Sequence, residues 1–235
     1  MTDTKPETAV RQPRERSSVP QRRGAGTALI ASGGVFFGAE FIAAAAWTDP
    51  PYSYTYHFIS NLGVHGPSTG FGQYMYSPLA WVMNAGFILF GLAALAGVVM
   101  LRGLPGRRRW AAIVLAALLA AGVTLVGLFP GSGEAIENGT AAFHGLGAFA
   151  AFICGNILVI LLGRAYQLLG VPRRLGRALV VLGILGFVSL VAFMADLSSD
   201  AGVLIGLVER GAVYSVLIGF ISVGAALRKR HIPTR

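Results

Sequence analysis

The sequence predicts an all-α protein built as a bundle of six transmembrane helices. Only 12% of the residues are charged, whereas a typical soluble domain has about 25%. The apolar share is 54%, and the mean hydropathy is +0.66. Lipid offers no partners for backbone N–H and C=O groups, so apolar stretches of roughly 20 residues must span it as helices. Six such stretches occur, at about 24–47, 79–101, 110–129, 143–163, 178–195 and 203–227.

The basic residues predict the orientation of these helices. Cytoplasmic connections of membrane proteins carry an excess of lysine and arginine. All 19 basic residues except Arg210 fall in four segments that six crossings would bring to one side: 1–23, 102–109, 164–177 and 228–235. We therefore predict that both termini are cytoplasmic and that the connection 47–78 lies outside. Because topology accounts for the net charge of +9, we expect no nucleic-acid partner.

These patterns divide the chain into three parts. Residues 1–23 are polar and interrupted by prolines, so they predict a disordered basic cytoplasmic tail. Residues 24–227 form the transmembrane domain, and 228–235 form a second basic cytoplasmic tail. The composition, rich in Ala, Gly, Val and Arg, is typical of proteins from GC-rich bacterial genomes. We therefore expect these spans to lie in a bacterial plasma membrane.

An alternative concerns the first apolar stretch. Arg22 and Arg23 precede an apolar run that ends in four alanines, which resembles a cleaved export signal and would leave five spans. The run also contains Glu40 and is long enough to cross a bilayer, so we favour a retained helix.

Ionisable residues inside predicted spans are the first functional candidates, because charges in lipid are costly. Glu40 lies seven residues before Trp47, about 10 Å below the outer end of its helix. Glu209 and Arg210 are neighbours in the last helix and point about 100° apart. Arg210 is therefore expected to pair with a carboxylate from another helix, such as Glu40, Asp49 or Asp196.

The outer ends of several helices and the connection 47–78 supply one group of polar candidates: Glu40, Asp49, His57, Ser60, Asn61, His144, Asp196, Glu209 and Arg210. Three interpretations stay open, namely a structural polar cluster, a cavity for a lipid or small ligand, and a catalytic or metal site. Histidine and carboxylates suit zinc, but no HExxH or CxxC spacing occurs and Cys154 is the sole cysteine. We predict no metal and no cofactor.

The connection 47–78 has the composition of a membrane interface. Asp49-Pro50-Pro51 is expected to end the first helix, and the segment from Ser60 to Gly66 suits turns and capping. We predict a short helix or re-entrant turn packed on the bundle rather than a floppy loop. Its aromatic residues resemble an interfacial belt: Trp47, Tyr52, Tyr54, Tyr56, Tyr74 and Tyr76.

Two stretches place glycines four residues apart, GVFFG at 34–38 and GVLIG at 202–206. Small residues at this spacing let membrane helices approach closely. We expect both patches to join helices within the chain, with contacts to a second copy or a membrane partner as the alternative.

Three motifs resemble the DUF998 family of prokaryotic multi-pass membrane proteins: YSYTYHFISNLGV, GLFPGS followed by FHGLGAF, and GLVERGAVYSVLIG. The resemblance extends over roughly residues 25–227. It implies a six-span fold in which the family's I-S-x-L-G element, F-P pair, histidine and E-R pair fall on Ile59 to Gly63, Phe129-Pro130, His144 and Glu209-Arg210. Asn61 stands where aspartate is common in the family.

The leading hypothesis is a non-enzymatic membrane protein whose polar extracytoplasmic cap binds a lipid or small ligand, or supports a partner. The alternative is an enzyme acting on lipid-linked substrates at the outer leaflet. There His144 or His57 would be the general base and Arg210 an anion clamp. A transporter is a third hypothesis, weakened by the scarcity of polar residues in the cytoplasmic halves of the spans.

Overall fold

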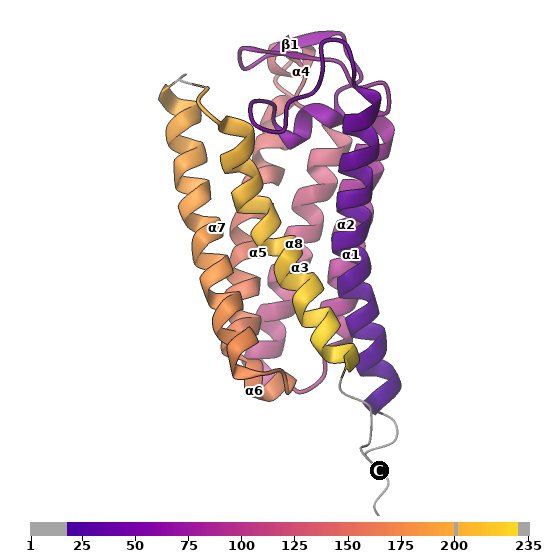
Figure 1. The fold of residues 1–235 in the computed structure, drawn as a ribbon, viewed down its shortest axis with the longest axis vertical. Coiled ribbons are helices and arrows are strands. Elements are labelled where there is room, and N and C mark those ends of the chain that lie inside the picture. The colour runs from indigo at the N-terminus through magenta and orange to yellow at the C-terminus, as the bar shows by residue number, and fades with distance from the viewer. Residues whose placement is uncertain (1–17, 200–201, 230–235) are drawn as a thin grey trace, which may run out of the picture.

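The computed structural model describes residues 18–199 and 202–229, and it confirms an all-α bundle. Six long helices run along a common axis (Figure 1). Each is long and apolar enough to cross a membrane. They are α1 (Ser18–Ala46), α2 (Ala80–Met100), α3 (Gly106–Leu128), α5 (Ala141–Arg164), α7 (Arg173–Ser199) and α8 (Ile205–Lys229).

The first helix begins earlier than the sequence suggested. Residues 18–23 were expected to belong to a disordered tail, but α1 starts at Ser18. The Arg22 guanidinium donates to the carbonyl of Leu169, the last residue of the short helix α6 (Tyr166–Leu169), and this ties the start of α1 to the bundle. The remainder of the expected tails, 1–17 and 230–235, lies outside the described residues.

The helices close into a ring in which sequence neighbours are also neighbours in space. α1 packs on α2, α2 on α3, α3 on α5, α5 on α7, α7 on α8, and α8 returns to α1. α5 and α8 also touch across the ring. There the Asn156 amide donates to the carbonyl of Ala212 at 3.1 Å and accepts from the Ser215 hydroxyl at 2.7 Å. Asn156 therefore joins two helices.

Close helix contacts are made by glycines. A methyl group at Gly147 of α5 would lie 2.5 Å from the carbonyl oxygen of Gly122 in α3, so the two backbones touch. Gly163 of α5 and Gly176 of α7 approach in the same way. Lipid provides little hydrophobic drive between helices, so such contacts are a main source of packing energy.

The two glycines of the GVFFG stretch do not pack against other residues of the described chain. Nothing in the described part of the chain lies within 4 Å of a methyl group placed at Gly34 or Gly38. The expectation of a close helix contact through these glycines is therefore wrong, because the buried face of α1 runs through other residues, including Phe36 of the same stretch and Ala39. Association with a second chain through this face stays a prediction. Gly206, in contrast, packs against the backbone at His57.

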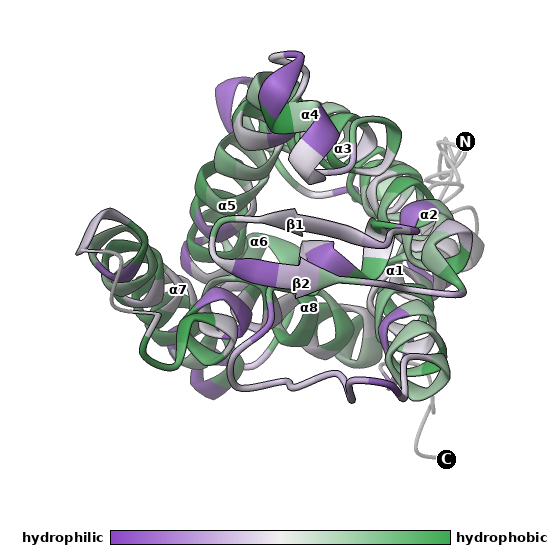
Figure 2. Cartoon of the chain, turned by 90° about the horizontal axis from the view of Figure 1, so that it is seen from above, coloured by the Kyte–Doolittle hydropathy of each residue, from purple (hydrophilic) through white to green (hydrophobic). Residues whose placement is uncertain are grey.

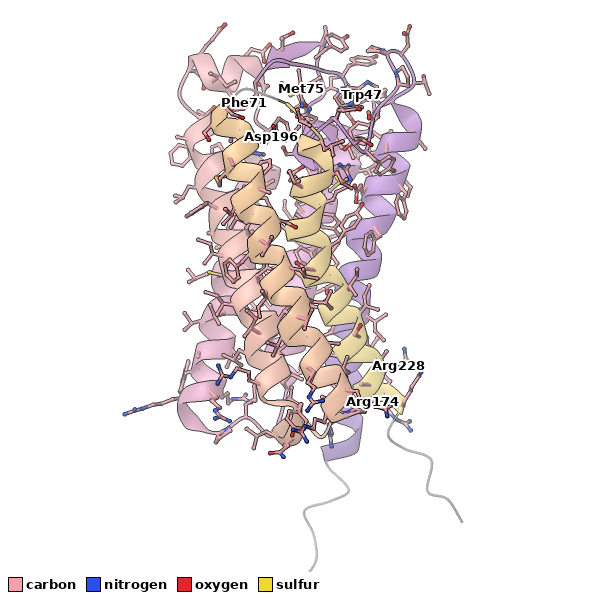
Figure 3. The ribbon with its side chains drawn as sticks, turned by 60° about the vertical axis from the view of Figure 1, so that its left-hand side comes forward. Trp47, Phe71, Met75, Arg174, Asp196 and Arg228 are labelled. Atoms are coloured by element: carbon pink, nitrogen blue, oxygen red, sulfur yellow. The ribbon has the colours of Figure 1, made fainter. Side chains whose placement is uncertain are left out.

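The two ends of the bundle differ in chemistry. Arg174 and Arg228 lie together at one end, and Trp47, Phe71 and Asp196 lie at the other (Figure 3). We call the segment 47–79 together with α4 (Gly133–Glu137) the cap. The cap covers the bundle end opposite the arginines (Figure 1).

The cap is ordered, as expected for a packed turn. It contains a 3₁₀ helix, η1 (Ile59–Gly63), and a hairpin of β1 (Ser68–Gly70) and β2 (Gln73–Met75) that lies across the bundle end (Figure 2). The pairing is antiparallel, with Ser68 opposite Met75. Phe71 and Gly72 join the strands with positive φ angles of 51° and 71°, the backbone of a tight hairpin turn. The sequence did not predict the hairpin, since its strands are three residues long and polar.

The predicted aromatic belt is only partly present. Tyr56 is 56% exposed and fits an interfacial position. Trp47 is only 2% exposed and stacks on His57, with ring centroids 5.3 Å apart. Trp47 is therefore part of the core that fixes the cap on the bundle.

Substituting Gly147 by alanine should destabilise the bundle, because the new methyl group meets the backbone of α3. We expect a loss of about 1–3 kcal/mol, as for other overpacked positions. Thermal unfolding in detergent measures it. The control is Gly145→Ala on the same helix, where nothing lies within 4 Å and an effect within about 0.5 kcal/mol is expected. Equal melting temperatures for the two variants would contradict a close contact of α3 with α5.

Candidate functional site

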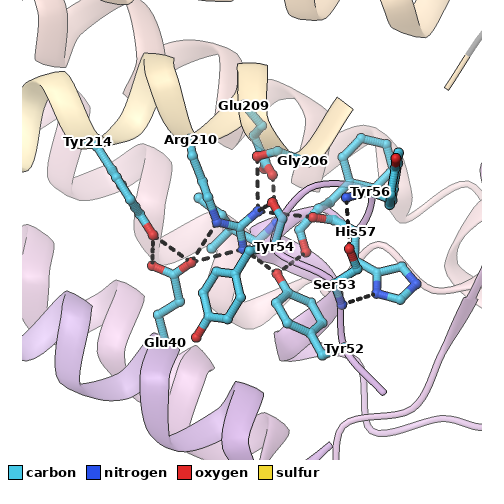
Figure 4. A network of polar contacts seen from close by, with 12 residues as sticks. Glu40, Tyr52, Ser53, Tyr54, Tyr56, His57, Gly206, Glu209, Arg210 and Tyr214 are labelled. Atoms are coloured by element: carbon cyan, nitrogen blue, oxygen red, sulfur yellow. Dashed lines mark hydrogen bonds and ion pairs between the residues drawn. The ribbon is translucent and has the colours of Figure 1, made fainter. Parts of the chain in front are cut away.

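Arg210 is the centre of the polar contacts beneath the cap (Figure 4). It lies on α8 and is 4% exposed. Its Nε donates to Glu40 Oε1 on α1 at 3.0 Å, and its Nη2 lies 2.9 Å from the same oxygen. The sequence allowed three partners for Arg210, and the structure selects Glu40. This ion pair joins α8 to α1 inside the bundle.

The remaining donors of Arg210 hold the cap. Nη1 donates to the carbonyl oxygens of Tyr54 at 2.7 Å, His57 at 3.1 Å and Gly206 at 2.9 Å. Nη2 donates to the Tyr52 hydroxyl. A guanidinium has five N–H groups, and these acceptors use all of its nitrogens. No donor is left for an anionic ligand, so a role for Arg210 as an anion clamp is incompatible with this arrangement.

Glu40 is fully saturated in the same way. Its side chain has no exposed surface, and besides Arg210 it accepts from the Tyr214 hydroxyl at 2.9 and 3.0 Å. Tyr214 follows Arg210 by four residues, so both project from one face of α8. Removing either charged partner of such a buried pair leaves an uncompensated charge, which is strongly destabilising.

Glu209 faces a different direction from its neighbour. Its Oε2 accepts from the backbone N–H of Ile59 in η1 at 2.6 Å. The side chain is 6% exposed, and its second oxygen makes no hydrogen bond within the described residues. Glu209 lines two adjoining cavities instead. The adjacent residues 209 and 210 thus serve two environments, because successive helix positions diverge by about 100°.

The larger cavity, which we call the side cavity, lies between α5, α7 and the cap. Its volume is about 450 Å³. Its walls are mainly apolar, from Phe58 and Phe71 of the cap, Phe149 of α5 and Phe193 of α7. The polar groups on its wall are few: Ser60, Asn61, His144 and Glu209.

A smaller cavity, the bundle cavity, continues from it toward the middle of the helices. Its volume is about 60 Å³, and its lining includes Phe36, Phe90 and Leu119. Both cavities share Ser60, His144, Ala148, Phe152 and Glu209. The shared wall therefore carries polar groups where the mainly apolar bundle cavity meets the cap.

The side cavity is open between α5 and α7. Phe149 is 48% exposed and Leu146 is 62% exposed on α5, although both line the cavity. The close contacts of α5 with α7, at Gly163 and Gly183, lie nearer the arginine-rich end. The cap end of α7 stands apart from its neighbours (Figure 2). In a bilayer this opening faces lipid.

A backbone contact determines which ring nitrogen of neutral His144 carries the proton. Nδ1 lies 2.8 Å from the carbonyl oxygen of Phe129. A carbonyl only accepts, so Nδ1 carries the proton and Nε2 of the neutral ring is an acceptor. His144 lines both cavities, which makes Nε2 a candidate to accept a hydrogen bond from a ligand.

His57 and Asn61 hold the cap together. His57 Nδ1 accepts from the backbone N–H of Ser53 at 2.9 Å. Burial lowers the pKa of His57 below its usual range, and the charge of Arg210 lowers it further. Asn61 donates its amide to Gln73 of the hairpin. Neither His57 nor Asn61 touches Glu40 through its side chain among the described contacts.

Two predicted site residues lie apart from these groups. Asp49 is exposed and makes no side-chain hydrogen bond in the described part of the chain. Asp196 accepts from the backbone N–H of Val203 at 3.0 Å and so supports the connection of α7 to α8. The predicted cluster thus divides into a structural network around Arg210 and a cavity wall around Glu209.

Sequence reasoning missed Tyr52 and Tyr214, the hydroxyl partners of the ion pair. The i,i+4 spacing of Tyr214 from Arg210 was a usable signal. The position of Tyr52 depends on the path of the cap and had none. Within residues 18–199 and 202–229, no group of three or more His, Cys, Asp or Glu side chains is placed to hold a metal ion.

Six apolar helices closed at one end by a polar cap define this chain as a multi-pass integral membrane protein. Residues 24–226 match the family model "Protein of unknown function (DUF998)", and the chain belongs to the DUF998 family. This confirms the resemblance carried by the three sequence motifs. Searches of curated proteins and of solved structures returned no match to the chain.

Replacing Arg210 by methionine should cost about 3–5 kcal/mol of stability, because it leaves Glu40 charged and buried without a partner. Arg174→Met is the matched control, since Arg174 is exposed at the other end and such changes cost about 0.5 kcal/mol or less. Thermal unfolding in detergent measures both. An Arg210→Met variant as stable as Arg174→Met would contradict the structural role of the ion pair.

Acid should destabilise the cap through His57. A lowered pKa in the folded state means that the unfolded chain binds the proton first, so the stabilisation is complete above about pH 6.5 and is lost as pH falls further. His57→Asn keeps an acceptor without a titrating ring and should flatten this pH dependence. The readout is the melting temperature between pH 7.5 and about 5.

The control is His65→Asn, because His65 is exposed in the same connection and makes no side-chain hydrogen bond in the described part of the chain. It should keep the pH profile of the unmodified protein. A profile unchanged by His57→Asn would show that another group governs the acid response.

Proposed function

We propose that this chain is a protein of the bacterial plasma membrane that binds a lipid-like amphiphile in the side cavity beneath its cap. The observation that carries the proposal is the cavity itself, with apolar walls, an opening between two helices and polar groups at its inner wall. Its volume of about 450 Å³ falls within the range of small-molecule sites, about 300–1,000 Å³.

The shape of the cavity favours an amphiphile over a fully polar ligand. Aromatic and aliphatic side chains such as Phe149, Phe193 and Leu197 suit a hydrocarbon chain. Ser60, Asn61, His144 and Glu209 suit a polar head. Exposed apolar surface between α5 and α7 supports entry from the bilayer, since such surface is stable only in contact with lipid.

The arginine-rich end supports a cytoplasmic placement of both termini, since basic connections are retained on that side. The cap would then face outward, and the side cavity would lie at the level of the outer leaflet. The proposed ligand is accordingly a component of, or a solute in, that leaflet.

A second candidate function is an enzyme acting on a lipid-linked substrate. One observation favours it, the Nδ1 contact of His144 that leaves Nε2 as an acceptor beside the cavity shared with Ser60 and Glu209. In that function His144 is the general base. It predicts turnover of a bound lipid that His144→Ala abolishes while binding is retained.

Binding is tested by native mass spectrometry of the protein released from nanodiscs made with bacterial lipid extract. The unmodified protein should retain a stoichiometric lipid or amphiphile. Ala148→Trp fills the wall shared by the two cavities and should lower its occupancy about tenfold, which corresponds to about 1.4 kcal/mol.

Ala192→Trp is the matched control, because Ala192 is exposed on α7 and does not line either cavity. Both variants must elute as the unmodified protein does on size exclusion. Equal occupancy in Ala148→Trp and Ala192→Trp, or the absence of any retained amphiphile, would overturn the proposal.

A further inference from the structure

The polar wall of the side cavity is made almost entirely of hydrogen-bond acceptors. Nε2 of His144 accepts, because Nδ1 is committed to Phe129. The Asn61 amide donates one of its two N–H groups to Gln73, and its carbonyl oxygen can accept a hydrogen bond. Glu209 contributes a carboxylate oxygen without a partner among the described residues. The donors that remain on this wall are the Ser60 hydroxyl, which can also accept, and the second N–H of Asn61.

Glu209 is a carboxyl group that makes no ion pair within the described residues. It is 6% exposed and receives one backbone hydrogen bond, from Ile59. Its neighbour Arg210 makes no direct contact with it, because that guanidinium is bound to Glu40 and to four oxygens of the cap and α8. The Arg210–Glu40 contact is the single ion pair within the described residues.

No lysine or arginine lines either cavity in the part of the chain that the structure describes. A phosphate or sulfate head would meet a carboxylate with no cation beside it, which is unfavourable at low dielectric. A positively charged head with N–H groups would instead supply both the missing charge and the missing donors.

The aromatic walls add to the same preference. Phe193 lies with its ring centroid 5.9 Å from those of Phe58 and Phe152, and all three line the side cavity. Ring faces attract cations, and more strongly once water is excluded. Aliphatic side chains of the same wall accommodate the chain of the ligand.

We propose that the side cavity selects amphiphiles with an ammonium head, which Glu209 binds as its counter-ion while the hydrocarbon chain lies between α5 and α7. This rests on the proposed function, since it assumes that the cavity is a binding site. It names the class of head group that the site accepts. The Ser60 hydroxyl and His144 Nε2 accept the remaining N–H donors of the ammonium.

The test compares three probes of equal chain length in maltoside micelles: dodecylammonium, dodecyl phosphate and added dodecyl maltoside. Native mass spectrometry and thermal shift give their apparent affinities. Dodecylammonium should bind at least tenfold more tightly than dodecyl phosphate. The net charge of the protein is +9, so unspecific attraction would produce the opposite order.

Glu209→Gln should remove the preference for dodecylammonium over dodecyl phosphate. Glu137→Gln is the control, because Glu137 is exposed and lines neither cavity. It should keep the tenfold preference. A preference for phosphate, or one that survives Glu209→Gln, overturns the head-group assignment and leaves amphiphile binding intact.

Nanodiscs distinguish the two sources of an ammonium head. Retention of phosphatidylethanolamine over phosphatidylglycerol identifies a bilayer lipid, and capture of dodecylammonium alone identifies a soluble amphiphile. Binding of none of the probes, together with no retained lipid, overturns both the head-group assignment and the proposed function.

Discussion

The structure depends on the buried ion pair of Arg210 with Glu40. A guanidinium cannot be deprotonated inside a protein, so its position between α1 and α8 requires that every N–H find an acceptor. Glu40 satisfies part of this requirement, and the carbonyl oxygens of Tyr54, His57 and Gly206 satisfy the rest. The connection after α1 is thereby drawn over the bundle end. The cap is ordered because the buried guanidinium of Arg210 requires backbone carbonyl oxygens of the cap as hydrogen-bond acceptors.

The same packing separates two carboxylates into different roles. Glu40 is enclosed by Arg210 and Tyr214 and has no surface for a ligand. Glu209 receives one hydrogen bond from η1 and faces a cavity. The cap contributes to this second environment as well, because it supplies Ser60, Asn61 and Phe71 to the cavity wall. The structural network and the cavity wall thus include neighbouring residues of one helix.

Much of the fold follows from hydropathy, because lipid permits few backbone arrangements. The six spans could be predicted for this reason. Glu40, His144, Glu209 and Arg210 could likewise be selected as candidates, because they are polar residues within or at the ends of apolar spans. The separation of Asp49 and Asp196 from the network was not, since sequence does not encode where loop residues lie relative to a helix face. Gly34 and Gly38 illustrate another limit of prediction from sequence. Small residues permit a close helix contact, but their spacing does not show which helix, if any, makes that contact. The side cavity depends on the divergence of α7 from α5, a property of packing and not of any single motif.

The cap is held largely through main-chain oxygens, which every amino acid possesses. Exchanging the side chains at positions 54 and 57 would therefore leave the acceptors of Arg210 in place. Attachment of the cap is encoded by Arg210 on α8, whereas the cavity wall is built from residues of the cap, α5, α7 and Glu209 of α8. Cap residues that line the side cavity can therefore change without removing the main-chain acceptors of Arg210. The side chains of the cap can therefore vary while the contacts of Arg210 with the cap backbone stay the same.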